Sequence, residues 1–426
     1  MLPCVMHASA PVAQSIERDI EMLRSSLLKL FGKESHSLDI PERVPSRAPE
    51  RVPSRAPERI FRKGITLRYG RIFVYLLDFL PADLPYNIDK PTNTKDWKIV
   101  PATFFLENLG WCASFINGTL IIDVRSLFNI DYVLRDDRAL NLLAFLFTIS
   151  GILESNDEEK VAAVKIFRYA VERGNPCAKL NLGRCLALGV GVNDDQKQAA
   201  NLYWQITEEA DRRYGRIADW ASVPFCGVYA SAQYHYGRCL LCGTGVPKDV
   251  KEAVKYFKLS AENGNPLGQC NYGRCLDEGI GLAENKQEAV KYYRLSADQG
   301  LAIAQYNYGI CLEDGIGIKR NLAEAAKYYR LSADQGYAGG QCNYGICLVN
   351  GIGIKMNKTD AVKYFKLSAD QGHAQAQYNY GVCLEHGFGI ETNQGEAAKY
   401  YRLSADQGDA DARLRLAGLK RGTGSQ

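Results

Sequence analysis

A unit of 36 residues repeats along the C-terminal two-thirds of this 426-residue chain, and it constrains the fold more than any other feature. A glycine landmark returns at this spacing at Gly237, Gly273, Gly309, Gly345 and Gly381. An alanine landmark in the other half of the unit returns at Ala253, Ala289, Ala325, Ala361 and Ala397. Two weaker copies precede these, since Ala163 and Ala199 are also 36 residues apart. Self-similarity of this length indicates stacked supersecondary units.

One copy, residues 302–336, predicts two short antiparallel helices. In its first half, Ala304 and Tyr308 have the i, i+4 spacing of one buried helix face. Gly309 lies within this pattern, and a glycine inside a helix costs up to about 1 kcal/mol relative to alanine. Its return in every copy therefore predicts a close approach of two helices. The sequence Gly-Ile-Gly-Ile at 315–318 predicts the turn that ends the first helix.

The second half of the same copy begins with a helix-start pattern. Asn321, followed three residues later by Glu324, is typical of a capping box, and most copies carry a similar pair. The residues expected to face inward are Ala325, Tyr328, Tyr329, Ser332 and Ala333. One such hairpin cannot bury its apolar face alone, so the copies are expected to stack into a solenoid.

These residues resemble the Sel1-like repeat family, which is related to the tetratricopeptide repeats. The positions that match the family pattern are Gly309, Gly315, Gly317, Ala325, Tyr328, Tyr329, Ala333 and Gly336. Tyr308, Leu312 and Ser332 stand where the family usually has Leu, Tyr and Ala. The resemblance covers about residues 139–420. It implies a mainly α protein, a right-handed α-solenoid that serves as an adaptor or scaffold for other proteins.

Residues 1–58 are expected to form a disordered arm. Within it, 13–31 could make one amphipathic helix, either without a specific role or for docking or oligomerisation. The octapeptide RVPSRAPE occurs twice over 43–58, and its regular prolines forbid helix and sheet. This segment is interpreted as an extended linker, with a proline-rich ligand for a partner domain as the alternative.

Residues 59–136 predict a small α+β domain of unknown family. The segment from Phe115 to Ile122 contains Asn117-Gly118, which is typical of a hairpin turn. Sel1-like repeats often follow a protein kinase domain, but this segment has no glycine-rich loop, no His-Arg-Asp and no Asp-Phe-Gly. A kinase domain is therefore excluded.

Charge and hydropathy argue against several partners and locations. The formal net charge of +4 favours neither nucleic acid nor a membrane surface. The longest apolar window, 139–153, is too short to span a bilayer and is interpreted as a buried helix. Residues 1–12 do not resemble a secretory signal. We therefore expect a cytoplasmic protein without a membrane span.

The cysteines and glycine pairs that could suggest chemistry have structural explanations. Of the 13 cysteines, Cys185, Cys239, Cys275, Cys311, Cys347 and Cys383 occupy one repeat position, which stacking would hold too far apart for disulfides. They are predicted to be small apolar core residues. The Gly-x-Gly pairs lack the third glycine and preceding strand of a phosphate loop. We expect no catalytic residue, no metal and no cofactor, and hence no enzyme.

A ladder of asparagines is the main candidate for a binding site. It comprises Asn271, Asn307, Asn343 and Asn379, with His235 at the corresponding earlier position. Asp314 shares a side with Asn307, and its counterparts differ in chemistry from repeat to repeat. In related solenoids such asparagines lie on the concave face and bind the backbone of an extended peptide, because an amide both donates and accepts. The alternative is a solvated or inter-repeat asparagine.

A second candidate lies in an insertion of 18 residues at about 211–230. It contains Trp220 and several arginines, residue types that dominate protein-binding hot spots. The alternative is a longer helix pair whose aromatic side chains pack internally.

The sequence thus predicts a non-catalytic scaffold or adaptor in intracellular signalling or complex assembly. Two alternatives stay open. One is an enzyme or regulatory domain in 59–136 with the repeats as its recruiting tail. The other is a quality-control adaptor of the endoplasmic reticulum, the role of some Sel1-like proteins. Nothing in the sequence identifies the partner or the pathway.

Overall fold

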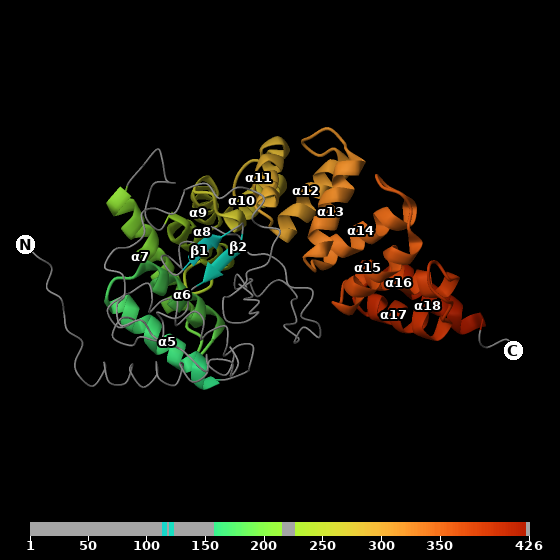
Figure 1. Ribbon diagram of the computed structural model, residues 1–426, viewed down its shortest axis with the longest axis horizontal. Helices are drawn as coiled ribbons and strands as arrows, with labels where there is room; N and C mark the ends of the chain where they lie inside the picture. Colours follow the sequence, from blue (N-terminus) through green and yellow to red (C-terminus); the bar gives the residue numbers. More distant parts are fainter. Residues whose placement is uncertain (1–112, 117–118, 123–156, 215–225, 423–426) are drawn as a thin grey trace, which may run out of the picture. The chain divides into compact units, whose positions relative to one another are not determined.

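The computed structural model describes residues 113–116, 119–122, 157–214 and 226–422 (Figure 1). These residues fall into two compact units, an N-terminal unit that ends at Asn263 and a C-terminal unit that begins at Gly264. The described part is mainly helical, as predicted, with the helices α5 to α18. The predictions for the arm at 1–58 lie outside the described residues.

Two short strands form the sheet structure of the described residues. β1 (Ala113–Ile116) pairs antiparallel with β2 (Thr119–Ile122), and Ile116 lies opposite Thr119 in the ladder. This register leaves a two-residue connection, the length expected for an Asn-Gly hairpin. The rest of the segment 59–136 lies outside the described residues, so the α+β domain stays a prediction.

The described residues of the N-terminal unit form five helices, which pack against one another in chain order. They are α5 (Asp157–Glu172), α6 (Pro176–Leu188), α7 (Gln196–Tyr214), α8 (Cys226–Cys242) and α9 (Val250–Glu262). The pairs α6–α7 and α8–α9 are helix hairpins of the predicted kind. The landmark alanines of α5 and α7, Ala163 and Ala199, are completely buried.

Within the part that the structure describes, the C-terminal unit has four hairpins and one final helix (Figure 1). The hairpins are α10 (Pro266–Glu278) with α11 (Lys286–Asp298), α12 (Ala302–Asp314) with α13 (Leu322–Asp334), α14 (Ala338–Asn350) with α15 (Lys358–Asp370), and α16 (Ala374–His386) with α17 (Gln394–Asp406). The final helix is α18 (Ala410–Gly422). We call the first helix of each hairpin helix A and the second helix B.

The predicted start and stop signals act as expected in the α12–α13 hairpin. Asn321 accepts a hydrogen bond from the Glu324 backbone N–H at 3.2 Å, and its side-chain N–H₂ donates to the Glu324 carboxylate at 3.0 Å. Helix A ends at Gly315, whose φ of 74° lies in the left-handed region that favours glycine. Gly317 has a further reason to be glycine, because a Cβ there would lie 2.4 Å from the Lys286 carbonyl oxygen. Its turn therefore packs directly on the preceding helix B.

The landmark glycine marks the predicted close approach of the two helices of one hairpin. A Cβ at Gly309 would lie 2.6 Å from Cε1 of Tyr329, well inside van der Waals contact. An aromatic ring of helix B covers the corresponding glycine in each hairpin; these rings belong to Tyr203, Phe257, Tyr293, Tyr329, Phe365 and Tyr401. The glycine thus lets a ring lie against the backbone of helix A.

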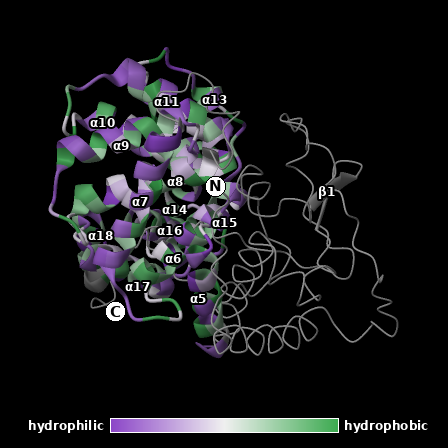
Figure 2. Cartoon of the chain, turned by 90° about the vertical axis from the view of Figure 1, so that its left-hand side faces the viewer, coloured by the Kyte–Doolittle hydropathy of each residue, from purple (hydrophilic) through white to green (hydrophobic). Residues whose placement is uncertain are grey.

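Each hairpin from α8–α9 to α16–α17 also carries a buried polar link. Ser332 is completely buried, and its Oγ donates to the carbonyl oxygen of Ala302 at 2.8 Å. Nearby, the Gln335 side-chain amide donates to that of Gln305 at 2.7 Å. The serine link recurs in the hairpins that contain Ser260, Ser296, Ser368 and Ser404. Hydrophobic and hydrophilic residues alternate along the helices (Figure 2), and these links let some polar residues lie inside.

The final helix α18 departs from the pattern at the landmark position. Ala412 is completely buried against the unit, like Ala376 one repeat earlier. Ala417 stands where the preceding helices A carry glycine, and it is exposed. No helix B follows α18 within the residues that the structure describes.

The cysteines whose side chains the structure describes are free thiols, and among them only Cys242 is exposed. Burial raises the pKa of Cys311 to about 12 and that of Cys383 to about 11. The repeat cysteines are therefore small apolar core residues, as predicted. Among the described helices, none is long and apolar enough to cross a membrane.

Candidate functional site

The asparagine ladder lies on the helices A of the C-terminal unit, on α10, α12, α14 and α16. Its members Asn271, Asn307, Asn343 and Asn379 are all half-buried. Each amide therefore lies partly at the surface and partly against its own array, as an inter-repeat asparagine would. The structure places these four predicted residues at equivalent positions of one unit.

The amide nitrogens of the ladder are turned toward the protein. Nδ2 of Asn271 donates to the Leu267 carbonyl at 2.9 Å. Nδ2 of Asn307 lies 3.9 Å from Sγ of Cys270, and Asn379 repeats this contact with the preceding repeat. An N–H···S contact of this length is weak. The carbonyl oxygens of Asn271 and Asn307 accept no hydrogen bond from the described residues, so they remain available to a donor.

Apolar side chains lie beside the ladder. Ile310, Ile346 and Val382 follow the asparagines by three residues along their helices and are half-buried as well. Residues three apart on a helix are surface neighbours. The helix A surface therefore offers one hydrogen-bonding amide and one aliphatic side chain in each of these repeats.

The last residue of each helix A varies in chemistry. Asp314 is exposed, and so are its counterparts Glu278, Asn350 and His386. This position shows two acids, one amide and one imidazole at the end of otherwise similar helices. It therefore gives each repeat a different polar group next to a shared apolar and amide surface.

His235 does not belong to this surface. Its side chain is buried in the N-terminal unit, where its Nε2 accepts from Nε of Arg184 at 3.2 Å. Its ring stacks on Tyr203, with 5.0 Å between the ring centroids. Burial, and to a lesser extent Arg184 and Arg238, lower the pKa of His235 well below its ordinary value. The imidazole therefore lies inside the fold, unlike the half-buried asparagines, and a role of His235 in partner binding stays a prediction.

The insertion separates α7 from α8, and Trp220 lies outside the described residues. The helices that flank it show a feature that the sequence analysis missed. Trp204 on α7 is 40% exposed, although indole rings are usually covered. It occupies the repeat position that Arg330 holds in α13. An aromatic residue at a position that is charged in other repeats was the sequence signal that could have revealed this exposed ring.

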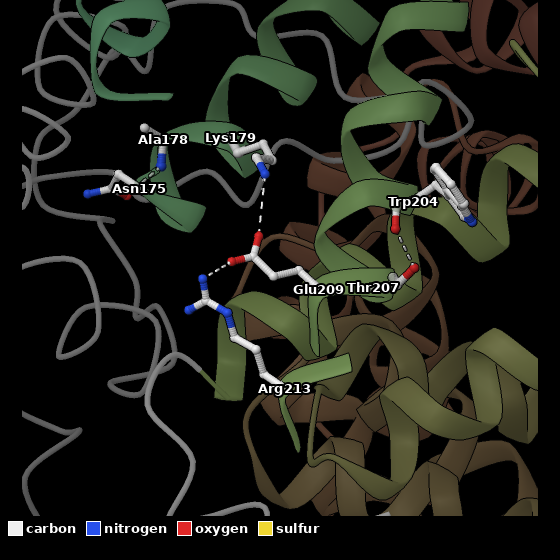
Figure 3. A network of polar contacts seen from close by, with 7 residues as sticks. All are labelled: Asn175, Ala178, Lys179, Trp204, Thr207, Glu209 and Arg213. Carbon is white, nitrogen blue, oxygen red and sulfur yellow. Dashed lines mark hydrogen bonds and ion pairs between the residues drawn. The ribbon is translucent and has the colours of Figure 1, made fainter. Parts of the chain in front are cut away.

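Trp204 lines an open pocket of about 530 Å³ with charged walls. Glu209 lies between two cations there, 3.4 Å from Nζ of Lys179 and 2.7 Å from Nη2 of Arg213 (Figure 3). Thr207 donates to the Trp204 carbonyl at 2.7 Å and satisfies its own hydroxyl within α7. Because the carboxylate already pairs with both cations, this pocket is less available for charge recognition than the helix A surface.

The described residues contain no group of three or more His, Cys, Asp or Glu side chains that could hold a metal ion. The described helices show hydrogen-bonded surfaces, and their described thiols are buried except that of Cys242. The arrangement can thus bind a partner by its surface groups.

Comparison with known families and structures adds the following. The Sel1 repeat model matches residues 178–203, 230–265, 266–301, 302–337, 338–373 and 374–409. The comparison with curated proteins gave no match. Among solved structures, c5321, a protective antigen of uropathogenic Escherichia coli with an SLR fold, is similar at 30% identity and a TM-score of 0.52.

The similarity to c5321 covers 67% of this chain and 56% of that chain, so this chain spans little more than half its length. A Sel1 repeat protein from Oxalobacter formigenes is similar at 25% identity and a TM-score of 0.49, over 61% of this chain and 96% of that one. With its six consecutive matches and its landmark glycines under aromatic rings, this chain belongs to the Sel1-like repeat family.

Proposed function

We propose that the chain is a non-catalytic scaffold that binds an extended segment of a partner protein along the helix A surface of its C-terminal unit. Sel1 repeat proteins generally act as scaffolds for protein interactions. A repeat array suits this role because it enlarges the contact area without needing a new fold for each partner.

The observation that carries this proposal is that asparagine amides lie partly exposed with hydrogen-bonding capacity left over. The Asn307 amide is half-buried and held from behind by Cys270, while its carbonyl oxygen is unoccupied among the described residues. A main-chain N–H of an extended segment is the matching donor. Ile310, one turn away, would contact an apolar side chain of the same segment. Within the described residues, the free carbonyl oxygen recurs at Asn271, and the aliphatic neighbour recurs at Ile346 and Val382.

The variable helix ends would select among partners. Glu278 and Asp314 favour a basic side chain, whereas Asn350 carries no charge. A partner whose cationic residues align with α10 and α12 would therefore bind more tightly than one of opposite charge. We place this activity in the cytoplasm, in the assembly of protein complexes, with no nucleic acid involved.

The proposal is tested with peptides selected by display against the full-length chain. Binding of a selected peptide is measured by titration calorimetry for the wild type and for the triple variant Asn271→Ala, Asn307→Ala and Asn343→Ala. Each lost neutral hydrogen bond is worth about 0.5–1.5 kcal/mol, so the affinity should fall by about tenfold or more.

A control variant changes Lys291, Lys327 and Lys363, which lie exposed on the helices B, to alanine. This variant should bind the peptide like the wild type. An unchanged affinity of the asparagine variant, or an equal loss in the lysine variant, would remove the helix A surface as the binding site.

A further inference from the structure

One leucine in each repeat lies exposed on helix B, between charged residues of the same helix. The exposed fractions are 50% for Leu295, 38% for Leu331, 51% for Leu367 and 48% for Leu403. We call these four residues the leucine column. Leu259 holds the same position in the N-terminal unit and is 39% exposed, so the feature belongs to the repeat and not to one helix.

Hydrogen bonds join the successive helices B and keep the leucines in register from one repeat to the next. The Tyr328 hydroxyl on α13 donates to Asp298 on α11 at 2.9 Å. The same bond recurs from α15 to α13 and from α17 to α15, at 3.2 and 3.0 Å. A single exposed leucine needs no explanation, but apolar side chains that recur in register on adjacent helices mark an interaction surface.

Charged residues of opposite sign flank the column. Four residues before each leucine is an exposed lysine; these are Lys291, Lys327, Lys363 and Lys399. Three residues after each leucine is an aspartate; these are Asp298, Asp334, Asp370 and Asp406. Residues at i−4 and i+3 lie one turn to either side on the same helix face. From the start to the end of helix B, the surface therefore shows a lysine column, the leucine column and an aspartate column. The residue directly before each leucine is a further exposed cation; these are Arg294, Arg330, Lys366 and Arg402.

We propose that the leucine column is an interface with a second copy of this chain. Consider two copies whose leucine columns face each other, related by a twofold axis that runs parallel to the columns and lies midway between them. Each leucine then lies opposite the same leucine of the other copy. The same rotation brings the lysine column of each copy over the aspartate column of the other. The surface is therefore self-complementary in charge, as a twofold interface requires. This inference goes beyond the proposed function, because it uses the helices B and leaves the helices A to the partner.

Intramolecular ion pairs do not compete strongly with this arrangement. Asp298 and Asp334 pair with the arginine four residues earlier at 3.6 and 3.8 Å, and Asp370 pairs with Lys366 at 2.6 Å. Lys363 pairs with Asp360 at 2.8 Å. All are exposed pairs on one helix, which contribute little to stability. An anionic membrane would attract the lysine column but repel the aspartate column, so a second copy fits the charges better.

The test measures self-association of the full-length chain by sedimentation velocity over a range of concentrations. The wild type should form dimers, and the double variant Leu331→Asp, Leu367→Asp should raise the dimer Kd by about tenfold or more. Leu414→Asp is the matched control, because Leu414 is 72% exposed on α18 and lies outside the column. It should dimerise like the wild type, and circular dichroism should show equal helix content in all three.

A charge exchange tests the orientation of the two copies. Lys327→Glu with Lys363→Glu should weaken dimers, and so should Asp334→Lys with Asp370→Lys, because like charges then face each other. A mixture of the two variants should associate again, since every facing pair is of opposite sign. Failure of the mixture to associate would overturn the proposed arrangement.

Two other results would overturn the proposal altogether. One is a wild type that remains monomeric, or a leucine variant that keeps the wild-type dimer Kd. The other is a monomeric wild type that co-sediments with phosphatidylserine vesicles and loses this binding in the leucine variant. That result would assign the column to a membrane surface.

Discussion

The ring of Tyr329 lies over the backbone of Gly309, so close that a single methyl group on that glycine would come within 2.6 Å of the ring. The two residues belong to the two helices of one hairpin, and the same pair of positions is occupied in this way in the other hairpins. The ring is completely buried, and its hydroxyl donates to Glu313 at 2.6 Å, which fixes it in place. Neither helix can move without breaking this contact.

Gly309→Ala should therefore destabilise the array in spite of the higher helix propensity of alanine. Overpacking of a fixed core site costs about 1–3 kcal/mol, which exceeds the gain of up to about 1 kcal/mol in propensity. Gly418→Ala on α18 is the control, because a Cβ there meets nothing within 4 Å. It should stabilise the protein slightly. Urea unfolding followed by circular dichroism compares the two, and a loss of equal size in both would contradict the steric explanation.

The stability of the N-terminal unit should fall in acid because of His235. Burial and the arginines beside it lower its pKa in the folded protein, so only the unfolded chain takes up a proton as the pH falls below the ordinary value of 6.5. The stabilisation is thus present above pH 6.5 and is lost below it, by up to about 1.4 kcal/mol per pH unit.

His235→Asn removes this titration and introduces the residue that the other repeats carry at the position. Its free energy of unfolding should depend less on pH between 7.5 and about 5 than that of the wild type. Chemical unfolding at several pH values measures the slope. The variant can be less stable at neutral pH, so the slope is the informative quantity, and an unchanged slope would contradict the burial of a neutral imidazole.

Because the repeat cysteines are buried, we expect the folded protein to lose stability at alkaline pH. Burial raises the pKa of Cys311 to about 12, above the ordinary 9.0 of the unfolded thiol. The stabilisation is complete below pH 9.0 and is lost as the pH rises toward 12, because only the unfolded chain releases its proton in that interval. Cys311→Ala should therefore lose less stability than the wild type between pH 8 and about 10. Urea unfolding at both pH values checks this, and parallel losses would contradict it.

The N-cap of α13 offers a matched pair of substitutions. Asn321→Ala removes the acceptor for the Glu324 N–H and should cost about 1 kcal/mol, whereas Asn321→Asp keeps an acceptor oxygen and should cost little. Thermal unfolding by circular dichroism distinguishes them. Equal melting temperatures for the alanine and aspartate variants would show that the cap does not stabilise the hairpin.

The hairpins could be predicted because their signals are local. Asn321 and Glu324 start a helix, and Gly315 ends one, through contacts with residues close to them in the chain. The recurrence of a glycine at the position of Gly309 in successive repeats indicated that two helices approach closely there. The sequence predicted that Ser332 faces inward, but it did not predict the hydrogen bond of Ser332, because the acceptor lies 30 residues away in the chain.

The candidate site was less predictable, because exposure depends on the neighbouring repeats. Periodicity grouped His235 with the asparagines, but the packing of Arg184 and Tyr203 around it puts it inside. The side chains of Asn307 and Trp204 could not be oriented from spacing alone. The exposed Leu331 carried no sequence signal of its own, since a leucine among helix B residues is ordinarily taken for core.

Ala417 has a consequence for how the array can grow. A further hairpin added after α18 would bring an aromatic ring onto the methyl group that the other helices A lack at this place. Duplication of the unit can lengthen the chain between existing hairpins, where glycine is present on both sides of each junction. A hairpin packed on α18 would therefore lose about 1–3 kcal/mol to overpacking at this position, and replacing Ala417 with glycine would remove that penalty.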